Sequence, residues 1–444
     1  MKSLYEAKSV TARVHKMFEE LLPGFTKPVR WMLAFLVVAM LAVGITRSVR
    51  DLYRKYLAKV TAKSLTALYY DLGYAKEKEP HSSMCALGSK AMSLVPAELR
   101  EYPVLVLTDD TLIEKFGRKF AHVELLFDHA AHDGRQYKNG HCFVSLMLCV
   151  PIGRDENGNA VYLPVPLEHR IWKKDGDSKL QIAHDMVKDL LPSLEMAKDI
   201  LILCDSWYTK SPFICILEED PRINIIAAAR ADTFMTRPDP PQPTGKRGRP
   251  RKWGDRVRPD DFELKSGILD DYLVGTREVR TKLFGDRVVT AFVTKPAGDS
   301  GSRRLYFSTL SEQELAAKMH VEEDEASGAG IRMYHERWHL EVFYEVGKLF
   351  WQLGGYMLRS GCGIERLVNL ISLAYAGMLI LPYTEDEFTY MRSVSPQDIR
   401  FEIGTILRDE LFSARLVQEL EKRNKSTEFI NGVKDAVYAL GHAA

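Results

Sequence analysis

The sequence predicts an α/β protein in which a mixed β-sheet is flanked by helices and preceded by a helical N-terminal region. Three observations support this fold class. Residues 1–95 place apolar side chains at spacings of three to four residues, which is typical of helices. Short β-type runs begin at Tyr102 and are separated by Gly, Asp and Asn. Fully apolar strands at 199–204 and 223–230 then alternate with helices, as in sheets that are covered on both faces.

Length, composition and charge limit the classes of protein to which this chain can belong. The 444 residues suffice for two or three domains, and 46% hydrophobic with 27% charged residues is ordinary for a globular protein. A formal net charge of +1 excludes a uniformly basic nucleic-acid binder, so nucleic-acid contacts must come from local clusters. Six cysteines without CxxC or metal-ligand spacing predict buried thiols in a reducing compartment. We therefore expect a cytoplasmic protein.

The helical N-terminal region contains one strongly apolar run, WMLAFLVVAMLAVG at 31–44. A membrane span needs about 20 apolar residues, so this run is too short. It also begins too far along the chain, after a mixed-charge segment, to be a signal peptide. We interpret it as a buried core helix and expect no membrane association.

The central part of the chain predicts a meander followed by alternating helices and strands. An amphipathic helix at 180–198, kinked or ended at Pro192, leads into the apolar strand 199–204. A helix at 209–219 connects this strand to the next. The four earlier strand runs are YPVLVLT (102–108), KFAHVELLFD (119–128), HCFVSLMLCVPIG (141–153) and AVYLPVPLE (160–168).

The remainder predicts a β-rich insertion and a helical C-terminal part. Residues 235–262 are rich in Pro, Gly, Arg and Lys, which indicates a linker or exposed loop. After the acidic segment 322–330, helical periodicity continues to the C-terminus. The apolar helix at 367–382 is expected in the core or, alternatively, at a dimer surface. The insertion comprises three strand runs, YLVGTREVRTKLFG (272–285), DRVVTAFVTK (286–295) and RRLYFSTL (303–310).

The most informative segment is YHERWHLEVFYEVGK at 334–348. On one helix, its residues Tyr334, Arg337, Glu341 and Lys348 would lie within an arc of about 60°. A stripe at this spacing normally carries apolar residues. Here one acid stands among groups that suit phosphate oxygens, which points to phosphodiester chemistry. The alternative is a solvated face with an ion pair, but the apolar residues around the rest of the helix favour burial.

Two further acidic sites follow predicted strands. Asp109 and Asp110 come after VLVLT, and Asp205 comes after LILC. Functional residues of α/β sheets gather just beyond strand carboxyl ends, although acids there also form turns and helix caps. Together with Glu341, these acids form a set of three carboxylates that can hold two Mg²⁺ ions. Two such metals about 3.5–4 Å apart would activate the attacking oxygen and stabilise the leaving one.

The spacing within 334–348 resembles the Tyr-Arg-Glu-Lys signature of bacterial insertion-sequence transposases in the DDE superfamily. The resemblance extends in order over residues 100–385. Three other motifs agree with it: TDDT at 108–111, LCDSWY at 203–208 and the basic GKRGRPRKWG at 245–254.

The resemblance implies an RNase H-like catalytic core with the β-rich insertion before the last catalytic helix. Family members usually carry Asp-x-Thr at the first position, which favours Asp109 with Thr111, while Asp110 stays open as an alternative. Two Mg²⁺ ions are expected, and Mn²⁺ can substitute. The implied metal ligands are Asp109, Asp205 and Glu341, and the implied contacts to DNA phosphates are Tyr334, Arg337 and Lys348.

A basic segment, GKRGRPRKWGDRVR at 245–258, carries seven Lys or Arg and one Asp. Its Arg-Gly-Arg-Pro core resembles a hook for a narrow AT-rich minor groove. The alternative is a flexible loop that contacts phosphates without sequence preference. Both interpretations place DNA here, and Trp253 either stacks on a base or anchors the loop. The expected DNA contacts are Lys246, Arg247, Arg249, Arg251 and Lys252.

The resemblance implies a DNA transposase that cuts transposon ends and joins the freed 3′-hydroxyls to target DNA. It further implies double-stranded DNA as partner, a homodimer in the synaptic complex and a bacterial, nucleoid-associated location. The alternatives are an inactive DNA-binding protein of transposase descent and an RNase H-like nuclease without strand transfer. The expected domains are 1–98 (helical, DNA-binding), 99–232 (first part of the core), 233–312 (insertion), 313–385 (last core helices) and 386–444 (helical C-terminal region).

Overall fold

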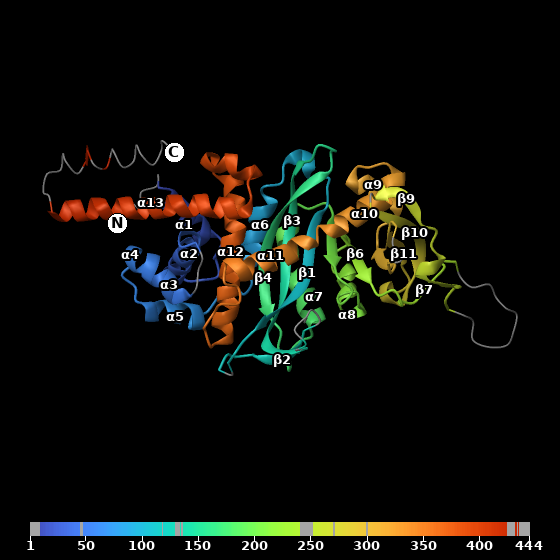
Figure 1. The fold of residues 1–444 in the computed structure, drawn as a ribbon, viewed down its shortest axis with the longest axis horizontal. Helices are drawn as coiled ribbons and strands as arrows, with labels where there is room; N and C mark the ends of the chain where they lie inside the picture. The colour runs from blue at the N-terminus through green and yellow to red at the C-terminus, as the bar shows by residue number, and fades with distance from the viewer. Residues whose placement is uncertain are drawn as a thin grey trace.

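The computed structural model is elongated, with helices at one end, a large sheet in the middle and further strands of that sheet at the other end (Figure 1). The structure describes residues 9–44, 48–117, 119–128, 134, 136–239, 252–269, 271–298, 301–423, 431–432 and 434.

The N-terminal helices surround one apolar helix, α2. Residues 32–42 of α2 are all buried, which confirms the predicted core helix. A helix that is apolar on every side must be covered on every side, and α1, α5, α12 and α13 pack against α2. The N-terminal helices are α1 (Val10–Glu20), α2 (Lys27–Ala42), α3 (Val49–Leu52), α4 (Ala58–Val60), α5 (Leu65–Tyr74) and α6 (Ser82–Met92), with a π-helical turn at Tyr53–Leu57 between α3 and α4.

Helix α12 (Gly361–Thr384) is the second apolar element of this core. In the part of the chain that the structure describes, it is the one helix whose length and hydropathy suit a membrane span, and 89% of that apolar window is buried inside the protein. Residues 367–382 therefore lie in the core, as the first of the two interpretations predicted.

The central sheet brings three parallel strands next to an antiparallel hairpin. β1 pairs in parallel with β5, and β5 with β6, whereas β3 is antiparallel to β1 and β4. The elements are β1 (Val104–Glu114), β2 (Glu124–Phe127), β3 (Tyr137–Arg154), β4 (Ala160–Ile171), α7 (Lys179–Leu190), β5 (Ile200–Cys204), α8 (Ser211–Ile214) and β6 (Ile223–Ala229). Helix α7 ends before a 3₁₀ turn that contains Pro192, as predicted.

Several predicted strand bounds are wrong, most clearly those of the first two strands. The run at 102–108 continues as β1 to Glu114, because its register with the long strand β3 extends to Glu114 opposite Gly140. The run at 119–128 contributes only Glu124–Phe127.

The β-rich insertion is part of the same sheet. β12 pairs with β6, so the core and the insertion form one 12-stranded sheet instead of two separate ones. The added strands are β7 (Met235–Thr236), β8 (Arg256–Val257), β9 (Lys265–Leu269), β10 (Tyr272–Arg280), β11 (Val288–Pro296) and β12 (Arg304–Ser308). β10, β11 and β12 confirm the three predicted strands.

The C-terminal part is helical, as expected. α11 crosses the sheet near β1, and α13 returns along the N-terminal helices (Figure 1). Besides α12, these helices are α9 (Glu312–Met319), α10 (Ala326–His335), α11 (Trp338–Phe350) and α13 (Pro396–Arg423). All six cysteines lie in described regions and are free thiols, but only Cys142, Cys149 and Cys204 are buried, so the prediction of buried thiols is wrong for the exposed Cys215 and Cys362 and for the partly buried Cys85.

Candidate active site

The register of the parallel strands brings two aspartates together. Thr108 of β1 is opposite Cys204 of β5, and each residue is followed by an aspartate. β5 ends at Cys204, so Asp205 begins the turn after the strand, as predicted. Asp109 instead lies inside β1, because β1 stays paired with β3 beyond it. Asp109 and Asp205 are therefore neighbours at the point where β5 leaves the sheet.

Asp109 and Asp110 point to different partners, as successive residues of a strand must. The Asp109 carboxylate accepts a hydrogen bond from Arg337 (Nη1 to Oδ2, 3.0 Å). The Asp110 carboxylate is held on the other side by Lys179 (Nζ to Oδ2, 2.8 Å) and by the Tyr208 hydroxyl (3.2 Å). Asp109 therefore faces the helix that carries Glu341, and Asp110 faces α7 and the turn after β5.

The Asp205 carboxylate is fixed by its own turn. Its Oδ1 accepts the backbone N–H groups of Trp207 (2.9 Å) and Tyr208 (3.3 Å). Burial raises the pKa of Asp205, and these two N–H groups act in the opposite direction. Both of these hydrogen bonds go to Oδ1, so one carboxylate oxygen is held by the backbone and Oδ2 is left for the site.

The expected single helix over 334–348 is broken. α10 ends at His335 and α11 begins at Trp338, and between them the backbone forms 3₁₀-type bonds, from Arg337 N to Tyr334 O and from Leu340 N to Arg337 O (both 3.1 Å). A 3₁₀ turn advances by about 120° per residue, so the predicted stripe does not continue through it. Glu341 lies in the first turn of α11.

Helix α11 is also more exposed than expected. Its inner face, with Leu340 and Phe343, is buried, but the Trp338 side chain is 61% exposed and that of Leu349 is 59% exposed. The prediction that this helix is buried on most sides is therefore wrong, because the sheet covers only one side of it.

Arg337 contacts candidate catalytic carboxylates of both the sheet and the helix. Its guanidinium donates to Asp109 and also pairs with Glu341. The ion pair of the solvated-face alternative therefore exists between Arg337 and Glu341, but in a half-buried setting in which the same guanidinium also binds Asp109. The charge of Arg337 partly balances two carboxylates at once.

The two strand carboxylates influence each other strongly. Burial and the nearby Asp205 carboxylate raise the pKa of Asp109 to about 7, although Arg337 acts in the opposite direction. Carboxylates that share a site disfavour each other's ionised form, and a cation between them relieves this repulsion. The site therefore has a deficit of positive charge.

The donor set fits a hard divalent metal in its chemistry. Asp109, Asp205 and Glu341 offer only oxygen ligands, which Mg²⁺ and Mn²⁺ prefer. Among the residues that the structure describes, no three acidic, His or Cys side chains are close enough to hold a metal ion. The Arg337 guanidinium lies between Asp109 and Glu341, so Arg337 has to shift before these two carboxylates can share a metal.

The other predicted DNA contacts have mixed outcomes. Tyr334 is buried against Tyr306 (ring centroids 4.9 Å apart), so its ring serves packing. Lys348 is exposed two turns beyond Glu341, with its ammonium 5.9 Å from the Tyr344 ring centroid. Of the basic segment, Lys252 is described and exposed, whereas Lys246, Arg247, Arg249 and Arg251 lie outside the described residues. Trp253 packs edge-on against Phe234, as an anchor of the loop would.

Sequence reasoning missed several residues at this site. Lys179 comes from the start of α7, and no local signal connects it to Asp110. Trp207 is 43% exposed and has two lysine ammonium groups near its ring, those of Lys210 (3.5 Å from the centroid) and Lys179 (5.1 Å). The signal in the sequence is limited to Trp207 two residues after Asp205 with Lys210 three residues beyond it; the exposure of Trp207 and the nearness of Lys179 come only from the fold.

Comparison with known proteins gives one result. The family model described as "DDE superfamily endonuclease" matches residues 20–266, which include Asp109 and Asp205 but not Glu341. A search of curated proteins finds no match.

Proposed function

Because the chain belongs to the DDE superfamily endonuclease family, we propose that it is a DNA transposase that cuts at transposon ends and joins the freed 3′-hydroxyls to target DNA. The observation that supports this most directly is the convergence of Asp109 and Asp205 from neighbouring parallel strands with Glu341 from α11. We further propose an RNase H-like core, a homodimer in the complex that holds two ends, and a location at the bacterial nucleoid.

The proposed roles follow from the contacts of each residue. Asp109, Asp205 and Glu341 would hold two Mg²⁺ ions, or Mn²⁺, which supply charge neutralisation at the reacting phosphate when bound. Asp110 is proposed as a positioning residue because Lys179 and Tyr208 already hold its carboxylate. Arg337 would move from the carboxylates to a DNA phosphate when metal enters, since its planar guanidinium suits both partners.

The DNA contacts are proposed at the rim of the same site. Trp207 is exposed beside Asp205 and could stack on an unpaired base near the cut, with Lys179 and Lys210 close to the adjoining phosphates. Lys348 would contact the DNA further along α11, and we propose the basic segment 245–258 as a further DNA contact. The packed ring of Tyr334 would support Arg337 (Cζ 5.8 Å from the ring centroid).

The test is cleavage of a plasmid that carries this reading frame with its native flanking DNA, in Mg²⁺ or Mn²⁺. Glu341→Gln keeps the side-chain shape and removes the charge, so we expect unchanged DNA binding and at least a hundredfold loss of cleavage. Glu345→Gln, one turn along the exposed side of the same helix, is the matched control and should cut like wild type. Cleavage retained by Glu341→Gln would refute this metal-ligand assignment.

The same assay distinguishes the roles of the two adjacent aspartates. Asp109→Asn should abolish cleavage, whereas Asp110→Asn should leave measurable cleavage and lower the melting temperature, because Lys179 loses its partner. The reverse pattern would assign the first ligand to Asp110. Cleavage without joined products would favour a nuclease without strand transfer, and binding without cleavage in wild type would favour an inactive DNA-binding protein.

A further inference from the structure

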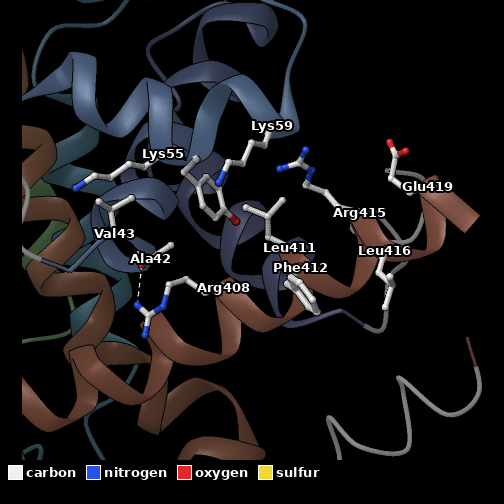
Figure 2. A pocket seen from close by; sticks show the side chains of 11 residues that line it. Ala42, Val43, Lys55, Lys59, Arg408, Leu411, Phe412, Arg415, Leu416 and Glu419 are labelled. Carbon is white, nitrogen blue, oxygen red and sulfur yellow. Dashed lines mark hydrogen bonds between the residues drawn. The ribbon is translucent and has the colours of Figure 1, made fainter. Parts of the chain in front are cut away.

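A second basic site lies away from the carboxylates, between the segment Val49–Val60 and helix α13. The two elements enclose a groove of about 480 Å³, with Ala42 and Val43 at its inner end. Four cations line it, Lys55 and Lys59 from the N-terminal segment and Arg408 and Arg415 from α13, together with one acid, Glu419 of α13. Figure 2 shows Lys59 and Arg415 reaching from opposite walls into the space between the helices.

The cations of the groove are poorly balanced by acids. Among the described residues, Lys55, Lys59 and Arg415 form no ion pair. Arg408 donates to the backbone oxygen of Ala42 (2.8 Å) at the carboxyl end of α2, so it faces a partial negative charge instead of a full carboxylate. Like charges from two walls repel each other, so their convergence is favourable only when an anion lies between them. The groove is therefore built for a negatively charged ligand.

The cationic surface continues beyond the groove along the same segment. Arg50 and Arg54 are exposed next to Lys55, and Asp51 is the single acid within residues 49–60. Cations spread over two helices exceed what one small anion needs and suit a row of phosphates. The apolar part of the wall, with Phe412 69% exposed, offers a surface for sugar rings between those phosphates.

We propose that this groove binds the phosphate backbone of duplex DNA without sequence preference. The inference rests on the proposed function, which makes DNA the substrate, and adds the place where the DNA is held. The net charge of +1 means that attraction to DNA must come from local clusters, and this groove is one. It lies at the helical end of the molecule, whereas α11 with the carboxylates lies near the middle, so the two sites hold different stretches of one duplex (Figure 1).

The test uses the full-length protein and a short duplex without transposon ends. We expect the triple variant Lys55→Gln, Lys59→Gln, Arg415→Gln to bind about tenfold or more weakly near physiological salt. Each phosphate contact contributes roughly 0.9 to the slope of log affinity against log salt, so the slope should fall by about 2 to 3. The matched control replaces Lys16, Lys188 and Lys198 by Gln, because each is paired with an acid and the change in net charge is equal.

A second measurement does not depend on affinity. Phe412, replaced by the photo-crosslinker p-benzoylphenylalanine, should crosslink to the duplex, and excess unlabelled DNA should suppress the product. Unchanged affinity and slope in the groove variant, or an equal loss in the control, would overturn the proposal. So would a variant that alters self-association or peptide binding but leaves DNA affinity intact.

The outcomes also separate this inference from the proposed function. If wild type cuts DNA and the groove variant binds normally, the groove inference fails while the transposase proposal stands. If wild type neither binds nor cuts DNA, both fail.

Discussion

At the scale of single residues, Asp109 and Asp110 are adjacent but differ in chemistry, because their surroundings differ. Asp109 faces Arg337 and Asp205, and its pKa is raised to about 7, whereas the Asp110 carboxylate is already bound by Lys179 and Tyr208. The sequence could place both acids in one short run but could not choose between them, since the choice depends on residues 69 to 228 positions away. It could identify Asp205, because a short apolar strand ends directly before it.

His169 behind the site is the clearest case of a buried titratable group. Its ring is 1% exposed, hydrogen-bonded to Ser145 and Ser372 (both 2.6 Å) and stacked on Phe343. Burial lowers the pKa of His169 to about 3. Ser145 is the β3 residue opposite Asp109, so this network supports the strand that carries the first aspartate.

We expect His169 to make stability depend on pH. An unfolded histidine takes up a proton near pH 6.5, whereas His169 in the folded protein takes one up only near pH 3. Its contribution is therefore fully present above about pH 6.5 and is lost progressively as the pH falls toward 3. Between pH 7 and pH 5 the loss should be about 2 kcal/mol in the free energy of unfolding.

Urea unfolding of wild type and His169→Gln at the two pH values measures this contribution, because the variant lacks the titrating group. The difference between pH 7 and pH 5 should shrink by about 2 kcal/mol in the variant. His339→Gln, a partly exposed histidine on α11, is the control and should behave like wild type. Equal pH dependence in wild type and His169→Gln would contradict the prediction.

At the scale of elements, buried arginines join helix ends that are far apart in sequence. Arg400 of α13 donates to the backbone oxygens of Phe350 (2.7 Å), at the end of α11, and of Met40 and Gly44, at the end of α2. Its guanidinium lies 3.8 Å from the Trp351 ring centroid. Carbonyl groups at helix C-termini lack intrahelical partners and carry partial negative charge, so a buried cation satisfies them.

Arg400→Met should therefore destabilise the protein by about 3 kcal/mol, because the methionine fills part of the space but leaves the carbonyl oxygens without donors. Thermal or urea unfolding measures this. Arg287→Met is the control, since Arg287 is exposed and should change stability by less than about 0.5 kcal/mol. A loss of the same small size in Arg400→Met would show that water replaces the guanidinium at these helix ends.

Element boundaries also show what local patterns miss. The apolar pattern of VLVLT ends at Thr108, yet β1 runs to Glu114 because β3 supplies hydrogen bonds along its whole length. The periodic stripe over 334–348 predicted one helix, yet the chain tightens at residues 336–337, where Arg337 reaches Asp109. In both places a partner distant in sequence overrides the local pattern.

At the scale of the whole molecule, the first and last of the labelled helices, α1 and α13, belong to one helical unit. Glu410 of α13 lies at the first turn of α1, and its carboxylate accepts hydrogen bonds from the backbone N–H groups of Val10 and Thr11 (both 2.8 Å). The same helix offers Arg408 and Arg400 to the carbonyl end of α2. Each charge is opposite in sign to the partial charge of the helix end that it contacts. The domain limits at 98 and 386 stay predictions. Sequence periodicity indicates helices in both terminal regions, but it cannot reveal that these helices share a core.

Removal of α13 should consequently unfold the N-terminal helices as well. A chain ending at residue 395 loses the apolar face that covers α2, including Ile403 and Leu407, together with both sets of helix-end contacts. Far-UV circular dichroism should show a loss of helix larger than the 28 residues of α13 itself, and proteolysis should attack the first 60 residues. A chain ending at residue 423 is the control and should keep the wild-type melting temperature. If the shorter chain loses only the signal of α13, the N-terminal helices fold independently, and the DNA groove is then a surface between two separate domains.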